Sequence, residues 1–289
     1  MDKLPISCFI IAKNEADRIA RTIRSVRPWV DEIVVVDSES TDDTVRVAAS
    51  EGCRVITQRW LGFGGQKRFA EDQCRNDWVL NLDADEVVTS ALRREIISLF
   101  AHVAPRFVAY GMPIELVYPN TSRPRRWARD HWYVRLYDRR IVRFRDSIVH
   151  DLVVTDGHPV GILRAPAYHY SFRSYEDLKR KLAERMQLSA KHANSTPAKI
   201  LARMAIEFPV NFFKYYIGRR HFMGGRNGLR YSWVQADYRL LKIFHMWRDR
   251  SSKSRAEPNS IADGQESVEG QADPNAAAVS PAAEMPLYG

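Results

Sequence analysis

Short apolar runs and amphipathic segments alternate through the first 83 residues, and this alternation constrains the fold more than any other feature of the chain. The run Ile6–Ala12 is apolar on both faces, as is typical of a central parallel strand. Ile19, Ile23 and Val26 then recur at helical spacing. Further apolar runs lie at residues 32–36, 53–56 and 78–83, with helices expected before Glu51 and from Gln66 to Cys74. Strand–helix alternation at this spacing predicts an α/β fold with a mostly parallel sheet that is flanked by helices.

Two carboxylates, Asp83 and Asp85, follow the last of these apolar runs. Alternate residues of an extended segment point the same way, so both acids are expected to face one spot. Ligands of open α/β sheets bind outside the carboxyl ends of the strands. Carboxylates at such a position suit a hard divalent cation that holds a diphosphate. The alternative is a solvated acidic turn, since Asp-x-Asp is common by chance, but the position after a buried strand favours a functional site.

Four motifs within residues 5–90 support this interpretation. They are Lys13-Asn14-Glu15 after the first strand, Asp37 with Ser40-Thr41-Asp42 after the second, the loop Gly62 to Lys67, and Asp83-Ala84-Asp85-Glu86. In order and spacing they resemble the family-2 glycosyltransferases of the GT-A fold. The resemblance is closest to the bacterial β-glycosyltransferases that build the inner core of lipopolysaccharide. It implies inverting, metal-dependent transfer of a sugar, by default glucose, from a nucleotide diphosphate to a hydroxyl of a lipopolysaccharide-core or similar glycolipid acceptor.

The resemblance also implies roles for individual residues. Asp85 is the expected protein ligand of a Mg²⁺ or Mn²⁺ ion, and Asp83 either touches the ribose or shares the metal. The donor, with UDP-glucose as the expected one, is implied to contact Lys13, Asn14, Glu15, Asp37, Lys67 and Asp83. Two of these residues have an alternative interpretation without a ligand. Asp37 is alternatively a turn cap, and Lys67 is alternatively a solvated surface lysine.

The acceptor side is expected between residues 91 and 170. Residues 148–152 place His150 and Asp151 beside each other at the end of an expected strand, where the relatives usually carry His-Glu. From the residues alone Asp151 is a cap or turn residue; the resemblance makes it the general base that accepts the hydroxyl proton. Glu86 is the next candidate for this role. Weaker candidates, each with packing or surface solvation as the alternative, are His150 and His169 near the metal or diphosphate, Arg125, Arg126 and Arg135 on acceptor phosphates, and Trp132 on a sugar ring.

Basic charge is concentrated in residues 171–250, which hold 17 Lys and Arg against 6 Asp and Glu. Aromatic residues are interleaved with these bases, a combination that suits an anionic membrane face. A nucleic-acid surface and a solvated helical extension are the alternatives, and no nucleic acid is expected as a partner. Residues 200–217 form the best membrane candidate, but Arg203, Glu207 and Lys214 argue against a span. Three cysteines without metal-site spacing and an N-terminus without a signal-peptide pattern favour a cytoplasmic protein, peripheral on the inner face of the bacterial cytoplasmic membrane.

The expected organisation is therefore a catalytic domain over residues 1–170, with a nucleotide-sugar half up to residue 90 and an acceptor half after it. A basic, aromatic helical extension follows over 171–250, and residues 251–289 form a disordered tail rich in Ala, Pro and acids. Two other functions remain open. A sugar nucleotidyltransferase would carry a Gly-rich basic loop after the first strand, which is absent here. A non-catalytic membrane- or nucleic-acid-binding protein on the same scaffold is disfavoured by the intact Asp83, Asp85 and Asp151.

Overall fold

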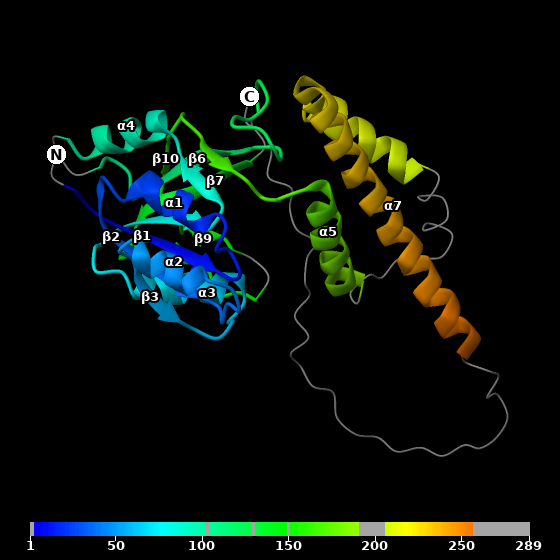
Figure 1. The fold of residues 1–289 in the computed structure, drawn as a ribbon, viewed down its shortest axis with the longest axis horizontal. Helices are drawn as coiled ribbons and strands as arrows, with labels where there is room; N and C mark the ends of the chain where they lie inside the picture. The colour runs from blue at the N-terminus through cyan, green and yellow to red at the C-terminus, as the bar shows by residue number, and fades with distance from the viewer. Residues whose placement is uncertain (1–2, 102–104, 129–130, 149–150, 191–205, 257–289) are drawn as a thin grey trace, which may run out of the picture. The chain divides into compact units, whose positions relative to one another are not determined.

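A nine-stranded mixed sheet forms the centre of the N-terminal part of the molecule (Figure 1). The computed structural model describes residues 3–101, 105–128, 131–148, 151–190 and 206–256. Neighbouring strands follow the order β3-β2-β1-β4-β7-β6-β11-β5, and β10 pairs with β6. The strands are β1 (Leu4–Ala12), β2 (Val30–Asp37), β3 (Arg54–Thr57), β4 (Trp78–Asp83), β5 (Glu86–Val88), β6 (Ala109–Leu116), β7 (His131–Asp138), β10 (Val160–Ile162) and β11 (Ala167–His169).

Helices cover both faces of the parallel half of the sheet, as the alternation predicted. Strands β1 to β4 pair in parallel, and successive residues of β1 enter two different apolar clusters. Ile10 packs with Ile23 of α1, whereas Phe9 packs with Ala70 of α3. The helices of this half are α1 (Ile19–Val26), α2 (Thr44–Ser50), α3 (Phe63–Asp72) and α4 (Ser90–Leu99).

The second half of the sheet is mixed. Strand β7 lies between β4 and β6 and runs antiparallel to both. Strand β11 is parallel to β6 but antiparallel to β5, and this pairing sets His169 opposite Glu86. A separate two-stranded sheet joins β8 (Arg143–Phe144) to β9 (Val153–Val154). This combination of a parallel nucleotide-side half and a mixed second half is the predicted GT-A-like α/β fold.

The described elements from residue 175 onward are helices. They are α5 (Tyr175–Ala190), a helical segment at 206–213, the π-helix η1 (Lys214–Gly218), the 3₁₀ helix η2 (His221–Gly224) and α7 (Gly225–Ala256). A third apolar cluster joins Leu116 at the end of β6 and Tyr118 after it to Leu178 of α5 and Val234 of α7. None of the described helices has the length and apolar character needed to cross a bilayer.

Three local predictions need correction. The glycines at 64 and 65 belong to α3, which begins at Phe63 rather than Gln66. Asp151 is not at a strand end, because it lies outside the strands, two residues before β9, and residues 149–150 lie outside the described residues. Helix α7 continues past the expected boundary at Ser251 to Ala256, and the rest of the expected tail lies outside the described residues. The chain divides into a unit from Met1 to Arg248 and a second unit, Asp249–Gly289, whose described residues are helical.

Candidate active site

Lys67 joins two carboxylates at the carboxyl end of β4. Its Nζ atom lies 3.0 Å from Asp83 Oδ1 and 2.8 Å from Asp151 Oδ2. The lysine side chain is only 1% exposed, whereas that of Asp151 is 44% exposed. A solvated lysine is therefore excluded. The site holds a buried cation beneath a carboxylate that solvent and substrates can reach.

The start of α3 explains this juxtaposition. Gly62 has a φ of +88°, and a Cβ atom there would lie 2.5 Å from the Cα of Ile148, so only glycine fits without displacing the backbone. The amide of Phe63 donates to the carbonyl of Ile148 at 3.2 Å. The amide of Gly64 donates to the carbonyl of Ser147 at 2.9 Å. The glycine-rich segment is thus a closely packed helix start, and it brings the chain before Asp151 onto the helix that carries Lys67.

Arg135 of β7 is a second buried cation that contacts Asp83. Its Nη2 atom lies 3.1 Å from Asp83 and 2.8 Å from Glu86, and Nη1 donates to the side chain of Asn81. Burial alone would raise the pKa of Asp83, but Lys67 and Arg135 outweigh it and hold that pKa well below its usual value. Burial dominates at Glu86 and raises its pKa despite Arg135.

Asp85 forms a second centre next to the first. Its Oδ1 lies 3.3 Å from His169 Nε2, and its Oδ2 lies 3.5 Å from Arg18 Nη1. Burial would raise the pKa of Asp85, but the imidazole and the guanidinium lower it on balance. Burial would likewise lower the pKa of His169, yet Asp85 raises it to about 9. The ionised carboxylate of Asp85, in the turn after β4, and protonated His169, at the end of β11, therefore form an ion pair.

A loop after β1 lies against the turn after β2. The carboxylate of Asp37 accepts hydrogen bonds from the amide and the hydroxyl of Ser40 at 2.8 and 2.5 Å. Asn14, with a φ of +56°, accepts from the amide of Thr41 at 2.8 Å. Asp42 accepts from the amide of Ala16 at 3.2 Å. Asp37 thus serves as a turn cap, and its carboxylate is buried beside the loop that carries Lys13, Asn14 and Glu15.

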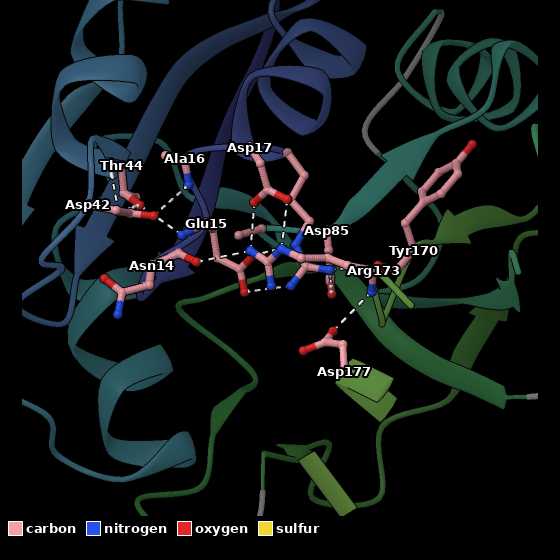
Figure 2. A network of polar contacts seen from close by, with 12 residues as sticks. Asn14, Glu15, Ala16, Asp17, Asp42, Thr44, Asp85, Tyr170, Arg173 and Asp177 are labelled. Atoms are coloured by element: carbon pink, nitrogen blue, oxygen red, sulfur yellow. Dashed lines mark hydrogen bonds and ion pairs between the residues drawn. The ribbon is translucent and has the colours of Figure 1, made fainter. Parts of the chain in front are cut away.

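Arg18 and Arg173 tie this loop to the rest of the site. Arg18 contacts both carboxylate oxygens of Glu15 and donates to the carbonyl of Tyr170 at 2.8 Å. Arg173 forms a two-pronged ion pair with Asp17, at 2.6 and 2.7 Å, and lies between the β1 loop and the start of α5 in Figure 2. Burial raises the pKa of Glu15 although Arg18 opposes it. Neither arginine was predicted as a site residue, and Arg173 belongs to the general basic excess of residues 171–250. Arg18 follows Glu15 by three residues, the spacing of a local ion pair, which was an available signal.

The donor set fits a divalent cation only in combination with a substrate. Within the described ranges, no group of three or more His, Cys, Asp or Glu side chains is arranged to hold a metal ion. Asp85 and His169 nevertheless offer one carboxylate and one imidazole side by side. Asp83 is held more closely by its cations, at 3.0 and 3.1 Å, than Asp85 is by His169 and Arg18, at 3.3 and 3.5 Å, so Asp85 is the better ligand of the two acids. Mg²⁺ sites of this kind use one or two carboxylates and take their other ligands from substrate phosphates and water.

Several weaker candidates do not occupy the expected place. Arg135 is buried on Asp83 and Glu86, so its predicted contact with acceptor phosphates is wrong. Arg125 is also buried and donates to the carbonyl of Arg219, which makes it a structural tie. Glu86 is 1% exposed and cannot replace Asp151 as the base.

Of the three other weak candidates, two are exposed on the surface and one lies outside the residues that the structure describes. Arg126 is exposed in a turn. Trp132 is 41% exposed, and its ring covers Gly111, where a Cβ atom would lie 2.0 Å away. His150 lies outside the described residues. The premise that an extended segment carries both acids was also wrong, because β4 ends at Asp83 and a turn carries Asp85.

The sequence of this chain is similar to those of several known proteins. The family model described as Glycosyl transferase family 2 matches residues 7–156. An uncharacterized glycosyltransferase of Rickettsia felis is 41% identical over 248 residues, which cover 82% of this chain and 88% of the relative. Another from Rickettsia typhi is 41% identical over 260 residues, 86% of this chain and 89% of the relative. The lipopolysaccharide core biosynthesis glycosyltransferase LpsC of Rhizobium meliloti is 41% identical over 104 residues, 34% of this chain and 38% of LpsC.

Solved structures give a weaker likeness. Glucosyl-3-phosphoglycerate synthase of Mycobacterium tuberculosis, in complex with Mn²⁺, UDP and glucosyl-3-phosphoglycerate, matches with 24% sequence identity and a TM-score of 0.33. The match covers 39% of this chain and 44% of that chain, less than half of either.

Proposed function

The chain belongs to glycosyl transferase family 2, and we propose that it transfers glucose from UDP-glucose to a hydroxyl of a glycolipid acceptor with inversion at the anomeric carbon. The observation that carries this proposal is the meeting of Lys67, Asp83 and Asp151 beside the pair formed by Asp85 and His169. Ligands of α/β sheets bind at the carboxyl ends of the strands, which is where these side chains converge.

The donor is proposed to lie over the loops that follow β1, β2 and β4. Asn14 and Glu15 are held against the turn capped by Asp37, which leaves a polar wall for the nucleoside. Asp85 and His169 are proposed to hold Mg²⁺ or Mn²⁺ together with the diphosphate. Such an ion neutralises the charge that gathers on the departing diphosphate. Lys67 contributes a further positive charge to the same region, since its ammonium is fixed between Asp83 and Asp151.

Asp151 is proposed as the base. Its carboxylate is open to solvent on one side and ion-paired with Lys67 on the other. In the transfer step, the acceptor oxygen bonds to the anomeric carbon, the bond from that carbon to the diphosphate oxygen breaks, and Asp151 takes the hydroxyl proton. The diphosphate leaves with the bonding electron pair. An alcohol is a weak nucleophile at neutral pH, so removal of its proton in the transition state is a typical task for a positioned carboxylate.

A lipid-linked acceptor is supported by the helical region and by one relative. Ile206, Val210, Phe213 and Ile217 recur at helical spacing and are all more than half exposed. Basic residues are plentiful between 171 and 250. Exposed apolar side chains within a basic region of the chain favour the interface of an anionic membrane, so we propose that the enzyme lies on the inner face of the cytoplasmic membrane. The similarity to LpsC over 104 residues supports an acceptor of the lipopolysaccharide-core type.

One experiment tests the core of this proposal. The full chain is incubated with a panel of nucleotide sugars and Mn²⁺, and release of the free nucleoside diphosphate is measured with and without a lipopolysaccharide core acceptor. UDP-glucose should be consumed faster when the acceptor is present, and NMR of the product should show the β anomer. Failure to consume or bind any nucleotide sugar would overturn the proposal, whereas use of another sugar would correct only the donor.

A further inference from the structure

A cavity of about 560 Å³ opens between the start of α5, the start of α7 and the loop after β6. It lies outside the cluster around Asp83 and Asp85, and no role proposed so far uses it. Residues from three separate segments line it, among them Asn120, Arg173, Glu176, Lys179, Arg230 and Trp233. Its volume is that of a site for a small molecule or a few sugar rings.

The lining is predominantly basic. Three of its side chains, Arg173, Lys179 and Arg230, are cationic, and Glu176 is the one acid. Neither Lys179 nor Arg230 forms a salt bridge with any residue that the structure describes. Glu176 lies near both side chains and offsets part of their charge, but the lining holds three cations against this one acid. The net positive charge favours an anionic ligand, and charge-assisted hydrogen bonds to phosphate or carboxylate are about twice as strong as neutral ones.

An aromatic wall lies beside these charges. Trp233 is 56% exposed although it lines the cavity, and the ring of Phe208 packs edge-on against it at 4.9 Å. Asn227 adds an amide, and its carbonyl and side chain accept from the hydroxyl of Tyr175. The indole of Trp233 is held in place by Phe208 and has polar groups around it. It therefore presents an apolar face next to hydrogen-bonding groups, and a sugar ring requires both.

Arg173 connects the cavity to the donor loop. The same guanidinium that lines the cavity lies 3.2 Å from the carbonyl of Asn14 and 3.4 Å from the carboxylate of Glu15. Figure 2 shows this guanidinium beside Asn14 and Glu15. Because Arg173 also lines the cavity, one side chain separates a ligand there from the loop after β1. This proximity is what a substrate needs if it is to extend from the cavity towards the reacting centre.

We infer that the cavity between α5 and α7 binds the anionic saccharide portion of the acceptor, with Lys179 and Arg230 on its phosphate or carboxylate groups and Trp233 against a sugar ring. This inference rests on the proposed function, because it assigns the acceptor side of that reaction. The ligand class is a phosphorylated oligosaccharide. The contacts are to the saccharide and its charges, so a deacylated, water-soluble acceptor should bind as well as a lipid-linked one.

Binding of a defined probe tests the inference without turnover. The probe is the deacylated, phosphorylated core oligosaccharide of a rough lipopolysaccharide, titrated by calorimetry into the full chain before and after phosphatase treatment of the probe. The double variant Lys179→Gln/Arg230→Gln should bind the phosphorylated probe roughly tenfold or more weakly than the unmodified chain. Both proteins should bind the dephosphorylated probe with the same, weaker affinity. Trp233→Ala should weaken binding of both probes.

A matched control removes the same charge elsewhere on α7. Arg226 and Arg239 are exposed and do not line the cavity, so Arg226→Gln/Arg239→Gln should keep the affinity of the unmodified chain. Equal loss in the two double variants would reduce the effect to general charge and overturn the inference. Unchanged probe affinity in Lys179→Gln/Arg230→Gln, reduced UDP affinity in that variant, or tighter binding of single-stranded RNA than of the probe would also overturn it.

The outcome is separable from that of the proposed function. UDP-glucose consumption in the absence of acceptor depends on the donor site alone. If UDP-glucose is consumed normally but Lys179→Gln/Arg230→Gln binds the probe as well as the unmodified chain, only the assignment of the cavity to the acceptor is refuted. Absent consumption with the expected loss of probe binding would keep the cavity as a saccharide site and remove the proposed reaction.

Discussion

The ammonium of Lys67 lies 2.8 Å from a carboxylate oxygen of Asp151, although 84 positions separate the two residues in the chain. The contact joins the helix after β3 to the segment before β9, and so it joins the proposed nucleotide side of the site to the proposed base.

Asp85 is predicted to be essential for metal-assisted donor binding. Asp85→Asn keeps the shape of the side chain and removes the charge that faces His169 and Arg18. Turnover should fall about 10²-fold or more, a typical cost for removing one electrostatic contact to the reacting groups. UDP affinity should lose its dependence on Mn²⁺, as measured by calorimetry with and without EDTA. Asp43→Asn, an exposed acid on Arg46, is the matched control and should behave like the unmodified chain. Full activity of Asp85→Asn, or of the unmodified chain in excess EDTA, would contradict the assignment.

Asp151 is predicted to act on the acceptor and not on the donor. Asp151→Asn should leave the Kd for UDP nearly unchanged and lower the transfer rate at saturating donor by roughly 10²–10⁴-fold, the usual contribution of a general base. Asp151→Glu should retain more activity because it keeps a carboxylate. Loss of donor affinity in Asp151→Asn would instead place this residue at the diphosphate, and a normal transfer rate would leave it a structural partner of Lys67.

Lys67 and Asp83 are predicted to depend on each other for stability. Lys67→Met leaves the carboxylate of Asp83 with Arg135 alone, and loss of one member of a buried pair should lower the free energy of unfolding by about 2–3 kcal/mol after allowance for the partial exposure of Asp83. Asp83→Asn in the same background should recover part of this loss. Urea unfolding of the two single variants and the double variant forms a double-mutant cycle. Additive losses would show that the two side chains are not coupled.

Arg18 is predicted to position Asp85 rather than to touch substrate. Arg18→Lys keeps the charge but loses the fork that reaches Glu15 and Tyr170, so the Mn²⁺ concentration for half-maximal activity should rise roughly tenfold. The pH profile of the transfer rate should keep its shape. Arg24→Lys, an exposed arginine of the same helix, is the control. An unchanged metal requirement in Arg18→Lys would reduce the contacts of Arg18 to packing.

The exposed apolar side chains near residues 206–217 are predicted to contact anionic lipid. Phe213→Ser/Ile217→Ser should reduce co-sedimentation with vesicles of phosphatidylglycerol and phosphatidylcholine by several-fold. Binding should also weaken with added salt, because exposed charges are screened over about 8–10 Å near physiological ionic strength. Equal sedimentation with pure phosphatidylcholine vesicles, or none with either, would count against a membrane surface.

Periodicity and motif spacing were sufficient to predict the parallel half of the sheet. The buried positions of α1 are Ile19, Ile23 and Val26, as the helical spacing predicted. These patterns are local, so the sequence shows them directly. The antiparallel insertion of β7 between β4 and β6 depends on pairing between distant segments, for which a single sequence carries no signal.

The acids of the site could be predicted from the sequence, but their partners could not. Asp83, Asp85 and Asp151 were singled out, and the structure brings Asp83 and Asp151 onto one lysine. The position of each arginine in the fold could not be predicted, because it depends on the buried residue with which the arginine pairs. Arg135 was predicted to contact acceptor phosphates and instead lies in the acidic cluster. Arg18 was not among the predicted site residues, yet it contacts both Asp85 and the carbonyl of Tyr170.

The acidic turn after β4 is anchored on both sides. The amide of Tyr170 donates to the carbonyl of Asp85 at 3.0 Å, the amide of Asp83 donates to the carboxylate of Glu86 at 3.0 Å, and β5 continues into its pairing with β11. Conformational freedom at this turn is therefore removed when the chain folds. A donor that binds there forfeits little of its interaction free energy to the ordering of the protein, so its affinity should depend on contacts with side chains that are already in place.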